Sequence, residues 1–486
     1  MPEPAPSPIA RPVTEAAVPL MIAGRTAAGE SAAPVRFPWD GSTAAMVAQA
    51  GPADVEAALA AAAGALDETA ALPRARRGAI LADLADRVEG RADELARLLL
   101  SETGKTVREV RLEVARTVST LRFSAEAAKR NVGEILPLDA MPGADGRVGL
   151  TVAEPVGVVA AIPAFNFPLL IAAHKLGPAI GAGCPIVIKP PEQTPLAILA
   201  LATEAIAAGW PAAALSVLPG SADVARALTE DPRVALVSFT GSSAVGRLVA
   251  RQSGLKRLML ELGSNAATII LADADLDLAI ERCAAGGYAA AGQSCISVQR
   301  VYVARERHAE LIERLTARVG SLRAGDPRLE TTDVGPVVDD ASAARIEAVI
   351  ADATAHGARV LVGGGRDSRL VQPTLLDGLT QAMRLQHEEI FGPVVAVAPV
   401  DSLEQAIALA NDSPYGLSAG VFTDSLQQAW QAVRGLKTGN VHVNEISSWR
   451  ADHMPYGGVK DSGYGKEGPS YAMAEMTHFK TVSLRV

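Results

Sequence analysis

The feature that most constrains the fold of this chain is a regular alternation of short apolar runs and helical patterns between residues 184 and 261. The apolar runs cover 184–189, 214–218, 234–239 and 257–261, and the helical patterns cover 195–208, 222–228 and 243–251. Strands and helices that alternate at this length form a parallel sheet covered by helices. We therefore predict an α/β unit over this stretch.

A second stretch, from residue 263 to about 460, repeats the alternation. Its helical patterns cover 274–290, 306–322, 340–356, 402–411 and 425–435, and its apolar runs cover 267–271, 298–303, 394–399, 418–422 and 440–443. The predicted fold class is therefore α/β with two sheet-containing units.

The remaining segments flank these units. Residues 1–15 indicate an extended lead that lacks the charged start and apolar run of a signal peptide. Small strands are expected over 18–50, and helices are expected from near Pro52, over 74–102 and over 106–130. Residues 131–155 predict a β-hairpin and 476–486 a final strand. Both segments are apolar and edge-like, so each needs a partner strand in this chain or in another subunit.

Composition narrows the function classes. A net charge of −9 argues against a nucleic acid partner. The three cysteines cannot all pair, which indicates a reducing compartment and thiol chemistry. No stretch of 18 uninterrupted apolar residues occurs, so no membrane partner is expected. We expect a cytoplasmic protein that acts on a small molecule, without a cluster of metal ligands.

Cys295 is the first candidate for chemistry. It ends the loop Gly292-Gln293-Ser294-Cys295, between a helical pattern and an apolar run. Small neighbours would let a substrate approach the sulfur. A packed, inert cysteine is the commoner role of this residue type and stays open as the alternative.

Glu261 and Asn166 are candidate partners of this thiol. Glu261 ends an apolar strand, where partial burial would raise its pKa toward the range of a general base. If this strand end is instead exposed to solvent, Glu261 has no catalytic role. Asn166 lies between Phe165 and Phe167 in a loop bounded by prolines, where its amide could stabilise an oxyanion. An ordinary turn asparagine is the alternative.

A strand–turn–helix junction is a candidate phosphate site. Phe239-Thr240-Gly241-Ser242, followed by Gly246, would place free backbone N–H groups and a helix N-terminus at the sheet edge. The spacing differs from the G-x-G-x-x-G fingerprint, and a plain tight turn remains possible.

Two charged loops could complete a dinucleotide site. Lys189 and Glu192 follow a predicted strand and could bind ribose hydroxyls. Glu389 and Phe391 precede another strand and could position the second ribose and a nicotinamide ring. Ordinary surface loops are the alternative for both.

These segments together carry a family resemblance. In chain order they are Asn166-Phe167-Pro168, Lys189-Pro190-Pro191-Glu192, Phe239-Thr240-Gly241-Ser242, Glu261-Leu262-Gly263, Gly292-Gln293-Ser294-Cys295, Glu389-Ile390-Phe391-Gly392-Pro393 and Pro455-Tyr456-Gly457-Gly458. In order and spacing the chain resembles the NAD(P)-dependent aldehyde dehydrogenase superfamily over almost its whole length.

The resemblance implies a fold and a quaternary structure. It implies two Rossmann-like parallel-sheet domains plus a small β arm for oligomerisation. The expected division is a dinucleotide-binding domain over 1–130 and 156–261, a catalytic domain over 262–465, and an arm over 131–155 and 466–486. Family members use such an arm to complete a neighbour's sheet, so a homodimer or homotetramer is expected.

The resemblance also implies a mechanism. The Cys295 thiolate attacks the aldehyde carbon, and Asn166 with the Cys295 backbone N–H holds the oxyanion. Hydride passes to the nicotinamide and leaves a thioester, which Glu261 helps water to hydrolyse. Family members that transfer the acyl group to coenzyme A lack this glutamate, so a free acid is the expected product.

The resemblance assigns the cofactor contacts by position. They are Ile162, Pro163, Lys189, Glu192, Phe239, Thr240, Gly241, Ser242, Gly246, Leu262, Gly263, Glu389 and Phe391. The expected cofactor is NAD, with NADP possible, because the Glu192 carboxylate would repel a 2′-phosphate. Two residues depart from the family pattern: Ser264 stands where a second glycine is usual, and Phe165 where tryptophan is frequent.

The resemblance also assigns a substrate tunnel. Its positions carry Leu112, Arg116, Phe167, Leu170, His174, Ser294, Ile296, Arg450 and Tyr456. Arg116, His174 and Arg450 would suit an aldehyde that bears a carboxylate, phosphonate or sulfonate. The arginines could instead pair with Glu113 or Asp452 and never face substrate.

Two further alternatives stay open. The chain resembles the branch that contains lactaldehyde, semialdehyde and phosphono-aldehyde dehydrogenases, so a small neutral aldehyde is the second candidate substrate. A catalytically silent structural relative is the third possibility, although Cys295, Glu261 and Asn166 are all present.

Overall fold

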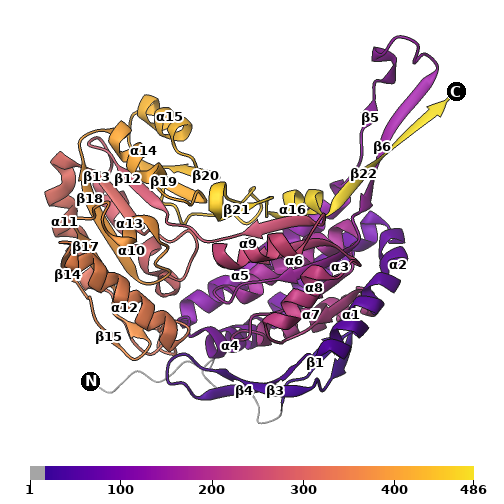
Figure 1. The fold of residues 1–486 in the computed structure, drawn as a ribbon, viewed down its shortest axis with the longest axis horizontal. Coiled ribbons are helices and arrows are strands. Elements are labelled where there is room, and N and C mark those ends of the chain that lie inside the picture. The colour runs from indigo at the N-terminus through magenta and orange to yellow at the C-terminus, as the bar shows by residue number, and fades with distance from the viewer. Residues whose placement is uncertain (1–16) are drawn as a thin grey trace.

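The computed structural model describes residues 17–486, as two α/β units and a projecting arm (Figure 1). The extended lead predicted for residues 1–15 lies outside the described residues. Within residues 17–486, no helix is both long enough and apolar enough to cross a membrane.

The first sheet has eight strands in the order β2-β1-β9-β8-β7-β10-β11-β21. The bounds are β1 Leu20–Ile22, β2 Arg25–Ala27, β7 Val158–Ile162, β8 Ile186–Ile188, β9 Leu215–Val217, β10 Val234–Thr240, β11 Arg257–Glu261 and β21 Gly463–Tyr464. The five central strands are parallel; four of them were predicted, and β7 was missed. The edge strands β1, β2 and β21 run antiparallel. β7 has side chains in apolar clusters on both faces of the sheet, which is typical of a central parallel strand.

Helices cover both faces of this sheet (Figure 1). They are α1 Pro52–Gly64, α2 Leu66–Ala71, α3 Arg74–Gly90, α4 Ala92–Thr103, α5 Val107–Arg130, α6 Pro168–Ala182, α7 Leu196–Ala207, α8 Ala222–Glu230 and α9 Ser243–Gln252. The single helix predicted over 74–102 is wrong, because Arg91 leaves the helical conformation at φ −110° and ψ 21° and separates α3 from α4. The Arg91 guanidinium instead pairs with Glu94 and with Glu204 of α7.

The second sheet has the order β14-β17-β18-β13-β12-β19-β20. Its strands are β12 Ala267–Ile270, β13 Arg300–Ala304, β14 Arg359–Val362, β17 Thr374–Asp377, β18 Val394–Val400, β19 Ser418–Phe422 and β20 Asn440–Val443. All neighbours are parallel except β14 and β17. The accompanying helices are α10 Leu276–Tyr288, α11 Arg305–Gly320, α12 Asp340–Ala355, α13 Arg384–His387, α14 Leu403–Asn411 and α15 Leu426–Gly435. The five predicted strands and five predicted helices of this region are confirmed, each end to within two residues.

The arm is a three-stranded antiparallel sheet that projects from the first unit (Figure 1). Its strands are β5 Ile135–Leu136, β6 Arg147–Pro155 and β22 Thr477–Arg485. The hairpin predicted over 131–155 is confirmed, and the predicted C-terminal strand pairs with β6 over nine residues. Each segment therefore finds its first partner in the same chain.

The chain returns to the first unit before it enters β22. β21 pairs with β11, and α16 (Pro469–Glu475) packs against α5 and α6. Two small sheets complete the structure: β3 (Ser31–Arg36) pairs with β4 (Thr43–Gln49), and β15 (Arg366–Asp367) pairs with β16 (Leu370–Val371). The segment between β20 and β21 thus connects the two units (Figure 1).

Candidate active site

A cavity of about 1280 Å³ lies between the two units. Segments that follow β7, β8, β10 and β11 form one side, and the loops around Cys295, Phe391 and Arg450 form the other. This is the carboxyl end of the first sheet's parallel strands, where ligands of open α/β sheets bind. The cavity therefore gathers segments that lie hundreds of residues apart in sequence.

Most of the predicted site residues line this cavity. They are Leu112, Arg116, Ile162, Pro163, Asn166, Phe167, Leu170, His174, Lys189, Phe239, Thr240, Gly241, Ser242, Glu261, Leu262, Gly263, Ser294, Cys295, Ile296, Glu389, Phe391, Arg450 and Tyr456. Glu192 and Gly246 are not among the lining residues. Glu192 is exposed to solvent next to Lys189. Gly246 serves packing, since a Cβ there would lie 2.5 Å from the Leu262 side chain.

The loop that carries Cys295 begins in an unusual conformation. Ala290, Ala291 and Gly292 have φ values of 51°, 53° and 69°. Left-handed backbone costs a non-glycine residue about 1–2 kcal/mol. Gly292 cannot be replaced without a shift, because a Cβ there would lie 2.0 Å from the carbonyl oxygen of Gly392. The Ala290 N–H donates to Glu109 Oε1 at 2.5 Å, which holds this turn from α5.

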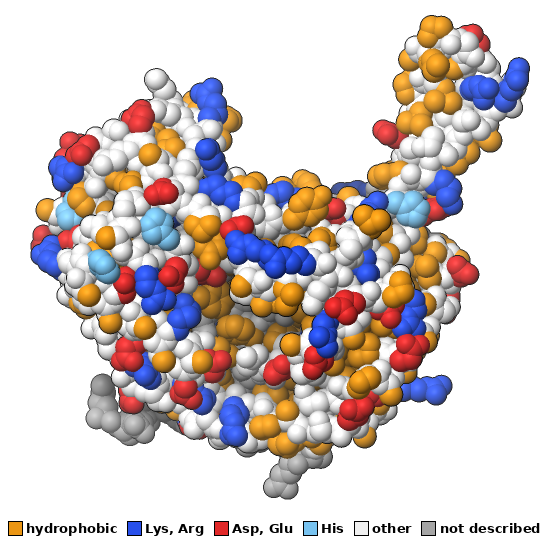
Figure 2. Space-filling model, viewed as in Figure 1, with side chains coloured by type: hydrophobic (Ala, Val, Ile, Leu, Met, Phe, Trp, Pro, Cys, Tyr) orange, Lys and Arg blue, Asp and Glu red, His pale blue; other side chains and the backbone are white. Residues whose placement is uncertain are grey.

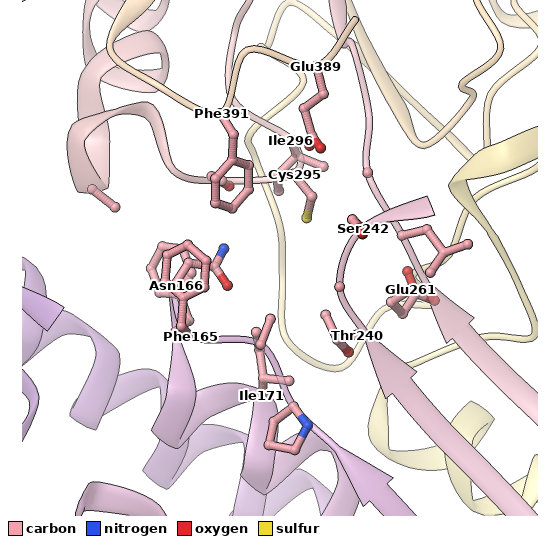
Figure 3. Close-up of a pocket in the computed structure, with 18 of the residues that line it drawn as sticks. Phe165, Asn166, Ile171, Thr240, Ser242, Glu261, Cys295, Ile296, Glu389 and Phe391 are labelled. Carbon is pink, nitrogen blue, oxygen red and sulfur yellow. The ribbon is translucent and has the colours of Figure 1, made fainter. Parts of the chain in front are cut away.

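This turn presents the Cys295 sulfur to the cavity, facing Asn166 across the space and with Glu261 to one side (Figure 3). Burial raises the pKa of the thiol to about 12, and a contact with the Tyr456 hydroxyl opposes that rise. Cys184 and Cys283 are fully buried, and burial raises the pKa of both thiols as well. Cys295 is thus the cysteine that a ligand in the cavity can reach.

Asn166 lies between β7 and α6, opposite the sulfur. Its Nδ2 donates to the carbonyl oxygen of Gln293 at 2.9 Å, so the amide is tied to the cysteine loop. Nδ2 carries a second N–H, which this bond leaves available. Among residues 17–486, the buried Oδ1 has no hydrogen-bond partner. The side chain is 7% exposed and can serve a ligand in the cavity.

Glu261 is the last residue of β11, paired with Thr240 and Gly463 in the sheet. Burial raises the pKa of its carboxyl well above the ordinary value, and the negative charge of Glu467 raises it further. In the described part of the chain, its Oε2 has no hydrogen-bond partner. Gly457 makes room for it, because a Cβ there would lie 2.8 Å from Glu261 Oε1. A buried carboxyl with a free oxygen is the arrangement of a general base.

The other end of the cavity suits a dinucleotide. Ser242 accepts a hydrogen bond from the Val245 N–H at 3.3 Å and caps the N-terminus of α9. The buried Thr240 hydroxyl has no partner among the residues the structure describes. A helix N-terminus and a free hydroxyl at a sheet edge fit a pyrophosphate. Burial lowers the pKa of Lys189, which lines the same wall.

Glu389 lies beside Gly263 at the boundary between the two ends. Its Oε1 accepts from the Ser264 N–H at 3.0 Å, and burial raises the pKa of the carboxyl to about 7. A Cβ at Gly263 would lie 2.5 Å from Glu389 Oε2, so this glycine allows the contact. The Phe165 and Phe391 rings meet edge to face with centroids 5.8 Å apart. Of the two residues that depart from the family pattern, Phe165 thus packs on Phe391. The other, Ser264, is buried.

The substrate end contains a network of buried charges. Arg116 donates two hydrogen bonds to Asp452, at 3.1 and 2.6 Å, which is one of the two pairings considered from sequence. Arg450 Nη2 lies 3.2 Å from His174 Nε2 and 3.4 Å from Glu467 Oε2. Both arginines nevertheless line the cavity. An arginine at this site can therefore pair with a carboxylate and still line the cavity.

Arg450 keeps unused hydrogen-bonding capacity. Its side chain is 10% exposed, and its buried Nε has no partner within residues 17–486. The same holds for Nδ1 of His174, which is 1% exposed. Lys175, whose pKa burial lowers, also pairs with Glu467, so two basic side chains share that carboxylate.

One face of α5 contacts three loops of the site. Glu109 binds the Ala290 N–H, Glu113 binds the N–H groups of Leu169 and Leu170 at the start of α6, and Arg116 binds Asp452. Sequence reasoning missed the first two roles. The signal was present, since positions i, i+4 and i+7 of a predicted helix lie on one face.

Glu467 and Lys175 were also missed. Neither belongs to a short motif, and they pair with each other across 292 residues of sequence. Within residues 17–486, no group of three His, Cys, Asp or Glu side chains is arranged to hold a metal ion.

Comparison with known proteins shows which family has this sequence and fold. Residues 25–482 match the model of the aldehyde dehydrogenase family. The 3-sulfolactaldehyde dehydrogenase of Priestia aryabhattai is 43% identical over 434 residues, which cover 89% of this chain and 91% of the relative. Aldehyde dehydrogenase 21 of Physcomitrella patens, solved with the reaction product succinate, superposes with a TM-score of 0.94 at 36% identity, covering 97% of this chain and 99% of that one.

A third relative was solved with a cofactor. Glyceraldehyde-3-phosphate dehydrogenase of Methanocaldococcus jannaschii, complexed with NADP, has a TM-score of 0.91 at 33% identity and covers 94% of this chain and all of that one (100%). The match extends over both α/β units and the arm. With its cysteine, asparagine and glutamate gathered in one cavity, the chain belongs to the aldehyde dehydrogenase family of oxidoreductases.

Proposed function

We propose that this protein oxidises a small aldehyde with a distal anionic group to the free acid, with NAD(P)⁺ as the oxidant. The observation that carries the proposal is one cavity that joins Cys295, Asn166 and Glu261 to the buried guanidinium of Arg450. Relatives whose names include sulfolactaldehyde, or whose structures hold succinate, are in keeping with such a substrate.

The cofactor would occupy the wall formed by the turn after β10 and by Lys189 and Glu389. When bound, its nicotinamide supplies the acceptor for the hydride. The α9 N-terminus, the Thr240 hydroxyl and the Glu389 carboxylate are the groups available to hold the pyrophosphate and ribose.

The chain's own residues divide the remaining work. The Cys295 sulfur forms a bond to the aldehyde carbon, and the free N–H of Asn166 Nδ2 stabilises the resulting oxyanion. Oxidation leaves an acyl thioester on Cys295. Glu261 then takes a proton from water, whose oxygen attacks the thioester and releases the acid and the thiol. The raised pKa of Glu261 makes it a stronger base than an exposed carboxylate.

The anion of the substrate would be bound at the Arg450 end. Arg450 Nε and His174 Nδ1 are buried without partners among the described residues, and both side chains line the cavity. Because two basic side chains share the carboxylate of Glu467, an added negative charge is compensated there. A singly charged carboxylate or sulfonate fits this arrangement.

A small neutral aldehyde such as lactaldehyde is the second candidate substrate. The observation that favours it is the Arg116–Asp452 pair, which already neutralises one of the two cavity arginines. Leu170 and Ile296 supply an apolar wall for such a substrate.

The two candidates are separated by following NADH absorbance with succinate semialdehyde, phosphonoacetaldehyde, lactaldehyde and butanal. We expect the highest kcat/KM with an acidic aldehyde and no turnover by Cys295→Ala. A higher kcat/KM with lactaldehyde than with either acidic aldehyde would select the neutral substrate. Turnover by Cys295→Ala within tenfold of wild type would exclude the proposed chemistry altogether.

NAD is the proposed cofactor, with NADP as the alternative. Glu192 is exposed beside Lys189, where its carboxylate would accept ribose hydroxyls and repel a 2′-phosphate. Wild type should show a higher kcat/KM with NAD than with NADP. Glu192→Gln should reduce this difference between the two cofactors. A preference for NADP in wild type would refute this assignment.

A further inference from the structure

The Cys295 sulfur contacts a side chain from near the other end of the chain. Cys295 Sγ and Tyr456 Oη lie 3.0 Å apart, within hydrogen-bonding distance for sulfur. The Tyr456 side chain is buried, and within residues 17–486 the sulfur is the hydrogen-bonding contact of its phenol. The hydroxyl is thus directed at the sulfur.

Tyr456 is held in place from two directions. Its N–H donates to the carbonyl oxygen of Glu467 at 3.0 Å, and the Glu467 N–H donates back to the Tyr456 carbonyl at 2.6 Å. The guanidinium carbon of Arg450 lies 3.8 Å from the centroid of the phenol ring. A guanidinium and the face of an aromatic ring attract each other. His174 and Glu467 in turn hold Arg450 in place. The hydroxyl therefore has a fixed position.

The surroundings of the sulfur disfavour a thiolate, and a hydrogen-bond donor offsets this effect. Ile296, Leu417 and the Tyr456 ring form an apolar cluster against Cys295. Burial there raises the pKa of the thiol, and the carboxylates of Glu389 and Glu261 raise it further. Arg450 and the Tyr456 hydroxyl act in the opposite direction. Of these two, the hydroxyl is the one that touches the sulfur.

We propose that Tyr456 is a positioning residue for the nucleophile, whose fixed phenolic O–H donates to the Cys295 sulfur and stabilises the thiolate when it forms. This rests on the proposed function, in which Cys295 is the nucleophile. The thiol proton passes to solvent and the phenol keeps its own, since burial raises the pKa of Tyr456 well above its ordinary value. The sulfur leaves the hydroxyl when it bonds to the aldehyde carbon.

The test is the pH dependence of Cys295 alkylation by iodoacetamide, located by peptide mass. Because Cys184 and Cys283 are fully buried, the adduct can be assigned to Cys295 in the folded protein. Tyr456→Phe keeps the ring under Arg450 but removes the hydrogen bond. At any pH below the midpoint its alkylation rate should fall about 10- to 100-fold, which corresponds to a midpoint about one to two pH units higher and is the effect of losing a hydrogen bond to a charged acceptor. Tyr471→Phe removes an exposed hydroxyl from α16 and serves as the matched control.

A second variant separates hydrogen bonding from a packing defect. Incorporation of 3-fluorotyrosine at position 456 keeps the hydroxyl but makes it a more acidic donor, so the midpoint should fall below that of wild type. Midpoints that stay unchanged, or that move in the same direction in both variants, overturn the proposal. The titration needs no aldehyde and no cofactor, so its failure is distinct from a failure of the proposed function, which the turnover of Cys295→Ala decides.

Discussion

Arg450 contacts three different groups of the site at once. It pairs with Glu467, lies against His174 and covers the ring of Tyr456. Its removal should therefore affect every substrate through Tyr456, and acidic substrates additionally through the lost charge. A comparison of two substrates separates these effects.

Arg450→Ala should lower kcat/KM for succinate semialdehyde by about 10- to 150-fold more than for butanal, the effect of one charge-assisted contact. The measurement is the initial rate of NADH formation with both aldehydes in wild type and variant. Equal losses on the two substrates would mean that Arg450 only supports the site. The neutral aldehyde would then be the better assignment.

At this scale the sequence predicted most of the cavity lining, because its motifs are short and each keeps its residues together. It was less informative where a role depends on a distant partner. Glu192 follows Lys189 by three residues but lies outside the cavity lining, so its contact with a ribose stays a prediction. Glu467 belongs to no motif, and its contacts with Lys175 and Arg450 appear only in three dimensions.

At the scale of elements, the first turns of α5 determine how the loops of the site are spaced. Glu113 forms a buried ion pair with Lys105 and also accepts hydrogen bonds from the Leu169 and Leu170 N–H groups, at 3.0 and 3.2 Å. These N–H groups begin α6, three residues after Asn166. The carboxylate therefore holds the loop that carries the proposed oxyanion donor.

Glu113→Leu should lower the free energy of unfolding by about 3–5 kcal/mol, because it leaves the Lys105 ammonium buried and unpaired. The double variant Lys105→Met/Glu113→Leu removes both charges and should recover much of this loss in urea titration. Its kcat should stay below wild type, since the start of α6 has still lost its acceptor. A double variant as unstable as the single one would show that the ion pair is not the cause.

Elements with a clear apolar period were predictable, whereas uniformly buried ones were not. α6 is buried along nearly its whole length, so the sequence shows no polar face that would mark a helix. β7 is likewise apolar throughout. The break between α3 and α4 was missed because Arg91 is a good helix former whose conformation depends on Glu94 and on Glu204 in α7.

At the scale of the whole molecule, the relevant feature is the apolar surface of the arm. β6 and β22 pair with each other, and apolar side chains remain on the surface of the arm (Figure 2). Exposed examples are Ile135, Met141, Phe479 and Leu484. Exposed strand edges with apolar side chains favour pairing with another chain.

We therefore expect a homodimer or a dimer of dimers by light scattering at micromolar concentration. Phe479→Asp/Leu484→Asp places charges on β22 and should shift the distribution toward smaller species. A monomeric wild type would contradict this role for the arm. An unchanged assembly in the double variant would place the interface elsewhere.

The two α/β units could be predicted from the sequence, because alternating patterns specify parallel sheets locally. The cavity between them could not, because it is formed by segments such as Ala290, Asp452 and Glu467 whose partners lie up to 336 residues away. The family resemblance supplied that arrangement as an expectation, and the fold agrees with it.

The central claim is that aldehyde oxidation proceeds through an acyl group on Cys295 that Glu261 helps to remove. The most direct measurement is rapid quenching of Glu261→Gln after mixing with NAD⁺ and succinate semialdehyde, followed by peptide mass and NADH absorbance. We predict one rapid turnover of NADH, a slow steady rate, and an acyl adduct on the Cys295 peptide. Loss of the burst together with the steady rate, and no adduct on Cys295, would contradict the account.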